Sequence, residues 1–122
     1  MPSSADANSG DAPRGVATIV LTTTADQAAA TKLAEQLLSD QLAACIQIDG
    51  PITSHYRWQG KLETEQEWRL MIKTTAAASD ELVAAILRWH PYDEPEILCL
   101  PVSSGSAGYL TWLAEQVRSG SD

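Results

Sequence analysis

The sequence predicts an α+β domain with a ferredoxin-like βαββαβ order, a long β-hairpin and one further helix at the C-terminal end. Two observations carry this prediction. Residues 52–74 contain two runs in which apolar and polar side chains alternate with a period of two, which is typical of half-buried antiparallel strands. Residues 24–40 and 79–89 have helical apolar spacing, and each stretch stands between two strand-like runs.

The predicted hairpin at residues 52–74 is the longest regular feature of the chain. Tyr56 and Trp58 share one face of its first run, and His55 lies on the other face. Gly60 stands between the runs and can adopt the positive φ that a tight hairpin turn needs. The arms are longer than one small sheet can use, and unpaired strand edges need a partner.

The first predicted βα unit begins at residues 16–23 (VATIVLTT), a continuous β-rich run that indicates a central strand covered on both sides. Thr24 is expected to open the first helix, because Gln27 stands three residues later and the two side chains can form a capping box. We expect the helix to end near Asp40. Its predicted buried face consists of Ala30, Leu33, Ala34, Leu37 and Leu38.

Two further strands are predicted, one before the hairpin and one after the second helix. Residues 43–48 (AACIQI) form the first of them, and Pro51 interrupts it with a bulge or bend because proline has no N–H for a ladder. Residues 97–102 (ILCLPV) form the second. The last predicted element is an amphipathic helix with Tyr109, Trp112, Leu113 and Val117 on its apolar face.

The second helix has clear predicted ends. Ser79 is a favourable N-cap, and acidic residues follow it in the first turn, where the helix dipole favours them. The helix is expected to run to about Trp89, because Pro91 disfavours helical geometry at His90.

The ends of the chain differ in composition from its middle. Residues 1–14 are rich in Ser, Ala, Asp, Gly and Pro and have no apolar period, which predicts a disordered N-terminal tail. We expect one folded domain over residues 15–118 and a polar tail over residues 119–122.

Charge and composition limit the classes of partner. The net charge of −8 leaves no basic patch for a phosphate backbone, so we expect no nucleic-acid partner. No stretch approaches the ~20 apolar residues of a membrane span, so we expect no membrane partner. Cys45 and Cys99 do not resemble a disulfide framework, and no secretory signal precedes the domain, so we expect a cytoplasmic protein.

Five motifs stand in order along the chain: LAAC at 42–45, YRWQGKLE at 56–63, KTT at 73–75, HPYDEPEI at 90–97 and YLTWL at 109–113. Together they closely resemble the CutA family of divalent-cation tolerance proteins over residues 16–117. The resemblance implies a ferredoxin-like fold and a homotrimer in which the hairpin arms continue the sheets of neighbouring subunits. Such an assembly is similar to the trimer of the PII signalling proteins. The resemblance also implies a protein that binds or responds to divalent metal ions such as Cu²⁺.

His90 and Cys45 are the candidate metal ligands. A neutral imidazole suits copper, and a cysteine is a soft ligand. In some family members a proposed copper site uses a cysteine on the first strand and two consecutive histidines, but here Thr22 and Trp89 stand at two of those positions. The competing interpretation is that His90 caps the helix or bonds a carboxylate, and that Cys45 packs as a small hydrophobic side chain.

A second set of residues combines aromatic and charged groups that the resemblance places near clefts between subunits. Aromatic walls with a few convergent polar groups form small-ligand pockets. The alternative function is therefore a PII-like trimeric signalling or scaffold protein that binds a small ligand or a protein partner in an intersubunit cleft. The competing interpretation is that these groups only pack the subunit interface. The residues are Tyr56, Trp58, Lys73, Tyr92, Glu94 and Glu96.

The sequence contains no recognisable catalytic motif. It has no Gly-x-Ser-x-Gly, no glycine-rich phosphate loop and no His-Glu-x-x-His. It also has no paired Cys or His at zinc spacing. We therefore expect a binding protein, not an enzyme.

Overall fold

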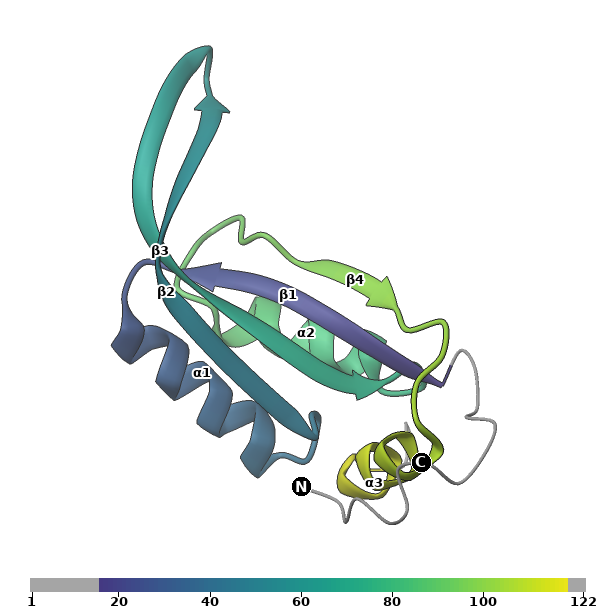
Figure 1. Cartoon of the computed structure of the whole chain (residues 1–122). Coiled ribbons are helices and arrows are strands. Elements are labelled where there is room, and N and C mark those ends of the chain that lie inside the picture. The colour runs from purple at the N-terminus through teal and green to yellow at the C-terminus, as the bar shows by residue number, and fades with distance from the viewer. Residues whose placement is uncertain (1–15, 119–122) are drawn as a thin grey trace.

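The computed structural model describes residues 16–118, which form a four-stranded antiparallel sheet and three helices (Figure 1). The predicted tails at 1–14 and 119–122 lie outside the described residues. The sheet order β2-β3-β1-β4 and the βαββαβ chain order confirm the ferredoxin-like prediction. The elements are β1 (Ala17–Thr24), α1 (Gln27–Ser39), β2 (Cys45–Trp58), β3 (Lys61–Thr75), α2 (Ser79–Trp89), β4 (Leu98–Pro101) and α3 (Ala107–Gln116).

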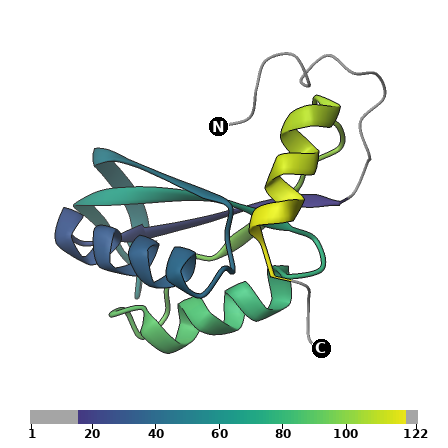
Figure 2. The same cartoon turned by 90° about the horizontal axis from the view of Figure 1, so that it is seen from below.

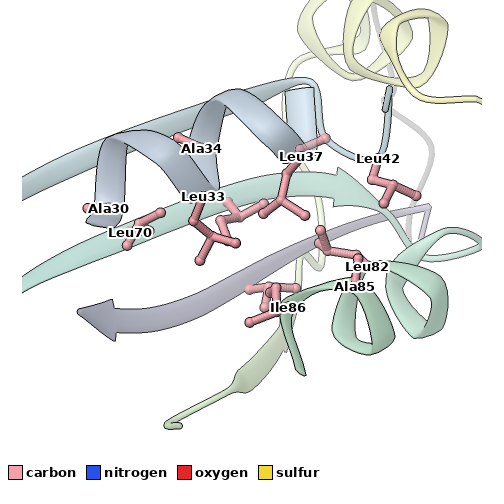
Figure 3. Close-up of a cluster of buried hydrophobic side chains, with 12 residues drawn as sticks. Ala30, Leu33, Ala34, Leu37, Leu42, Leu70, Leu82, Ala85 and Ile86 are labelled. Carbon is pink, nitrogen blue, oxygen red and sulfur yellow. The ribbon is translucent and has the colours of Figure 1, made fainter. Parts of the chain in front are cut away.

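One face of the sheet carries the main core. Val20 of β1 and Ile46 of β2 both stand opposite Ile72 of β3, so the three side chains share this face. Helices α1 and α2 cover it from the same side (Figure 2). Figure 3 shows Leu37 of α1 and Leu82 of α2 among the side chains that meet over the sheet, and both are buried.

The predicted start of the first helix at Thr24 is wrong. Thr24 stays in β1, where it pairs with Trp68 of β3. The N-cap is Asp26, whose carboxylate accepts a hydrogen bond from the Ala29 N–H at 2.7 Å. Strand pairing therefore competes successfully with the capping box, and the helix begins at Gln27.

Two other helix details also differ from the predictions. Leu38 is 40% exposed whereas Leu37 is fully buried, because consecutive helix residues lie about 100° apart and only one of this pair can point at the sheet. Ser79 is the first residue of α2, Ala78 occupies the N-cap, and the Ser79 hydroxyl donates to the Ala76 carbonyl. Within residues 16–118, no helix is long and apolar enough to cross a bilayer.

The β2–β3 hairpin is confirmed and projects well beyond the rest of the sheet (Figure 1). The ladder shifts register between Asp49 and Ile52, which confirms the predicted interruption as a β-bulge inside one long strand. At the turn, Gln59 has φ 50° and Gly60 has φ 79°. Positive φ at both central residues is the signature of a type I′ turn, which matches the twist of a hairpin.

The other face of the sheet is covered at one end by α3, where Leu110 and Leu113 pack against Ala17. Next to α3 and beyond it, cross-strand neighbours on β1, β3 and β4 place five apolar side chains on this face. In the described chain, two of these, on edge strand β4, are about half exposed. The five are Ile19, Leu21, Met71, Leu98 and Leu100.

Candidate functional site

A cleft of about 800 Å³ lies between the β2–β3 hairpin and the segment that follows α2. Its aromatic walls are Tyr56, Trp58 and Tyr92. Within residues 16–118, no lysine or arginine lines the cleft, so this lining is strongly negative. Its carboxylates are Glu63, Glu65, Glu67, Asp93, Glu94 and Glu96.

Strand geometry explains why three of these carboxylates face the cleft together. Glu63, Glu65 and Glu67 alternate along β3, and alternate residues of a strand point to the same side. Tyr56 stands opposite Glu63 and Ser54 stands opposite Glu65 in the β2–β3 ladder. The hairpin therefore forms one wall of the cleft from both of its arms.

Hydroxyl groups hold two of the carboxylates in place. The Tyr56 hydroxyl donates to Glu65 Oε1 at 2.6 Å, and Ser54 Oγ donates to Glu67 Oε1 at 2.7 Å. The Tyr92 hydroxyl donates to Glu67 Oε2 at 3.0 Å. Because these donors are neutral, they fix the carboxylates without cancelling their charge.

The surroundings of both phenols raise their pKa values. The hydrogen bond to Glu65, with a smaller contribution from burial, raises the pKa of Tyr56 to about 12. Burial and the hydrogen bond to Glu67 raise the pKa of Tyr92 above its usual range. Both tyrosines therefore remain hydrogen-bond donors throughout the physiological pH range.

His90 is the C-cap of α2 and contacts two residues that line the cleft, Thr23 and Tyr92. The residue is 7% exposed, and Nε2 lies 2.6 Å from the Thr23 carbonyl oxygen. Nδ1 accepts the Tyr92 N–H at 3.0 Å, which assigns the proton to Nε2. The His90 and Tyr92 rings also pack 4.8 Å apart. Both ring nitrogens are engaged, so a metal could bind His90 only by displacing one of these bonds.

The structure places Cys45 far from His90. Cys45 pairs with Lys73, which pairs with Ile19, whereas His90 bonds to Thr23. Ile19 and Thr23 are four residues apart on β1, which is about 13 Å along a strand. The two candidate ligands therefore do not share one site within this chain. Among residues 16–118, no group of three His, Cys, Asp or Glu side chains could hold a metal ion. Metal ligation by either residue stays a prediction.

The structure brings together most of the second predicted set of residues. Tyr56, Trp58, Tyr92, Glu94 and Glu96 all line the cleft. Lys73 does not, because it lies near the other end of the sheet, where its Nζ is 5.8 Å from the centre of the Tyr109 ring.

Sequence reasoning missed the β3 carboxylates. The alternation of Glu63, Glu65 and Glu67 was a usable signal, since it places three like charges on one face of a predicted strand. The two hydroxyl partners, Ser54 and Tyr56, alternate in the same way on the facing strand.

Comparison with known proteins identifies the family. The family described as "CutA1 divalent ion tolerance protein" matches residues 18–116. The chain belongs to the CutA1 family. A family relative from Pectobacterium atrosepticum, named divalent-cation tolerance protein CutA, is 42% identical over 108 residues, covering 88% of this chain and 98% of the relative. A CutA relative from Salmonella newport is 41% identical over 113 residues, covering 93% of this chain and 98% of the relative.

Solved structures of CutA1 proteins have the same fold. The divalent cation tolerance protein of Thermus thermophilus has a TM-score of 0.81 at 39% identity, covering 84% of this chain and 99% of that one. CutA1 from Oryza sativa gives 0.82 at 36% identity, with coverage of 86% and 96%. CutA from Synechococcus elongatus gives 0.84 at 34% identity, with coverage of 90% and 97%.

Proposed function

We propose that this CutA1 chain assembles as a homotrimer and collects divalent cations such as Cu²⁺ in the acidic cleft beside the hairpin. The observation that carries the proposal is the charge of the cleft. Among the residues that the structure describes, six carboxylates and no lysine or arginine line it, and neutral hydroxyls hold two of these carboxylates in place. A concave surface with charges of one sign raises the local concentration of the opposite ion.

The spacing of the carboxylates determines how a cation is held. Neighbouring members of the Glu63, Glu65 and Glu67 row are two residues apart on one strand, or roughly 7 Å. One ion can therefore contact two of them at most, and bound water or a side chain of another subunit completes its shell. Among first-row divalent ions, Cu²⁺ generally binds nitrogen and oxygen sites most tightly. This arrangement favours exchangeable binding over a closed metal cage.

Calorimetric titration with Cu²⁺ in a non-chelating buffer tests the site. Glu65→Gln/Glu67→Gln keeps the size of both side chains and removes two cleft charges, and we expect it to weaken binding by about tenfold or more, roughly 1.4 kcal/mol. The matched control is Glu35→Gln/Glu115→Gln, which removes the same charge from exposed positions on α1 and α3 and should change the affinity little.

The same titration should be carried out on His90→Ala and Cys45→Ser, because these two residues are the competing candidate ligands. The cleft proposal predicts that both variants keep most of the Cu²⁺ affinity. A loss confined to His90→Ala or Cys45→Ser, with the glutamate variant unaffected, would instead assign the metal to those side chains.

Two features support self-association. The open face of the sheet exposes Leu98 and Leu100 beside three other apolar side chains, and contiguous apolar surface of this kind marks an interaction site. The hairpin, which projects well beyond the core sheet, carries Leu62, which is 78% exposed. A second copy can pair with the free strand edges and cover this face. Light scattering during size-exclusion chromatography should give three times the chain mass of 13.1 kDa, and a stable monomer would remove this part of the proposal.

A PII-like role is the second candidate, and the size of the cleft favours it. A volume of about 800 Å³ with three aromatic walls exceeds what a single ion needs and falls within the range of small-molecule sites. In this case Trp58→Ala should abolish capture of the ligand or protein partner and leave the oligomer intact. Retention of every interaction by Trp58→Ala would leave the cation role as the better account.

A further inference from the structure

The acidic cleft has aromatic walls as well as negative charge, whereas a metal ion would use only the charge. Trp58 is 56% exposed and Tyr56 is 38% exposed, although both line a concave surface. The face of an aromatic ring carries partial negative charge, so exposed rings beside carboxylates attract organic cations. The lining therefore favours a ligand that is both cationic and apolar.

The charge of the cleft is available to such a ligand. Among residues 16–118, no ion pair joins a cleft carboxylate to a cationic side chain. The hydrogen bonds that Glu65 and Glu67 accept come from neutral hydroxyls. An ionised carboxylate has about four lone-pair sites, so each of these groups can accept further N–H donors from a bound cation.

The β3 carboxylates form a row with regular spacing. Glu63, Glu65 and Glu67 occupy alternate positions of one strand, so neighbours lie roughly 7 Å apart and the row spans roughly 13 Å. Two amino groups joined by four methylene groups lie roughly 6 Å apart in an extended chain, because each bond is about 1.5 Å long. A linear polyamine can therefore place successive ammonium groups on successive carboxylates of the row.

The aromatic residues stand beside this row. The Tyr56 hydroxyl donates to Glu65 Oε1 at 2.6 Å, and the Tyr92 hydroxyl donates to Glu67 Oε2 at 3.0 Å from the segment after α2. Trp58 is two residues from Tyr56 on β2, so the two side chains leave the strand on the same side. A methylene chain that follows the carboxylates therefore runs beside aromatic rings from two parts of the chain.

We propose that the acidic cleft binds a linear aliphatic polyamine. Its ammonium groups pair with the β3 carboxylates, and its methylene groups lie against the rings of Tyr56, Trp58 and Tyr92. An amine chain of this kind combines N–H donors for the carboxylates with cationic and apolar surface for the rings. This inference rests on the proposed function, because it uses the cleft assigned to cations, but it names an organic cation where that function names a metal ion.

Spermidine is a suitable probe, and hexaamminecobalt(III) is its comparator, because both carry three positive charges and only spermidine has a methylene chain. Calorimetry of the full-length protein at physiological ionic strength should show spermidine binding about fivefold tighter or more, which one cation–π contact supplies. Trp58→Leu keeps an apolar side chain and removes the ring, so it should remove most of this preference. Leu87→Ala is the matched control, because Leu87 is 55% exposed on α2 and does not line the cleft.

The carboxylates are tested in the same titration. Glu65→Gln/Glu67→Gln should weaken spermidine by about tenfold or more, because it removes two charge-assisted hydrogen-bond acceptors. Glu35→Gln/Glu115→Gln removes the same charge from α1 and α3 and should change the spermidine affinity little.

Three results would overturn the inference. They are the absence of spermidine binding to the wild-type protein, hexaamminecobalt(III) binding at least as tightly as spermidine, and an unchanged spermidine affinity in Trp58→Leu. Cu²⁺ titration of the wild-type protein separates this inference from the proposed function. Cu²⁺ binding without spermidine binding removes the polyamine alone, whereas spermidine binding without Cu²⁺ binding removes the metal role and keeps the polyamine site.

Discussion

Gly50 is the position in the β2 bulge where a small substitution should have a large effect. A Cβ atom there would lie 2.5 Å from Cδ1 and 2.7 Å from Cγ of the Trp68 ring. Ordinary contacts begin near 3.4 Å, so the ring and the strand would have to separate by about 0.9 Å. Trp68 packs against the main core and cannot turn away freely. We therefore expect Gly50→Ala to destabilise the fold by overpacking.

The expected cost is about 1–3 kcal/mol, the range for forcing an extra methyl group into a packed site. For a domain of this size the melting temperature should fall on the order of 10 °C. Thermal unfolding followed by circular dichroism measures the change. Gly105→Ala is the matched control, because its added Cβ would lie 3.4 Å from a Leu110 methyl carbon, at the edge of ordinary contact.

A double-mutant cycle tests the mechanism directly. In a Trp68→Leu background the ring is absent, so the added cost of Gly50→Ala should shrink to that of Gly105→Ala. The reasoning fails if Gly50→Ala costs the same in both backgrounds, or if it melts no lower than Gly105→Ala.

Two other predictions concern buried threonine hydroxyls and the ionisation of Tyr56. Thr74→Val removes the buried hydrogen bond from Oγ1 to the Leu42 carbonyl, so the free energy of unfolding measured in urea should fall by about 1–3 kcal/mol. Its control is Thr22→Val, which replaces a hydroxyl that has no partner in the described chain and should leave the free energy of unfolding unchanged or raise it. Equal losses would contradict this. Tyr56 should ionise at about pH 12, so its contribution to stability is complete below pH 10 and is lost as the pH rises through 12. In Glu65→Gln, the midpoint of the Tyr56 absorbance titration should move towards pH 10. An unchanged midpoint would refute the role of the hydrogen bond.

The sequence was sufficient for the order of elements because the period of two is long and uninterrupted in the hairpin. It also located the helix ends near Asp40, which is the C-cap of α1, and at about Trp89, which is the last residue of α2, and it located the bulge near Pro51. The helix starts were harder. Thr24 has a favourable local capping pattern, but its pairing with Trp68 is a contact between distant parts of the chain that no local pattern contains.

The candidate site shows the same division. All six residues of the second set belong to motifs that the sequence displays, and the resemblance grouped them. Five of the six line the cleft, whereas Lys73 lies near the Tyr109 ring in the structure. The hydrogen bonds of His90 to Thr23 and to the Tyr92 N–H depend on tertiary placement. Such hydrogen-bond partners could not be predicted from the sequence, because they depend on how the sheet packs against the segment after α2.

The most direct test of the central proposal, a trimer that collects divalent cations, is native mass spectrometry of metal-free protein titrated with Cu²⁺. We predict an assembly of three 13.1 kDa chains that gains Cu²⁺, and a Glu65→Gln/Glu67→Gln assembly of the same subunit number that gains markedly less. A monomer, or equal Cu²⁺ uptake by the two proteins, would contradict the proposal.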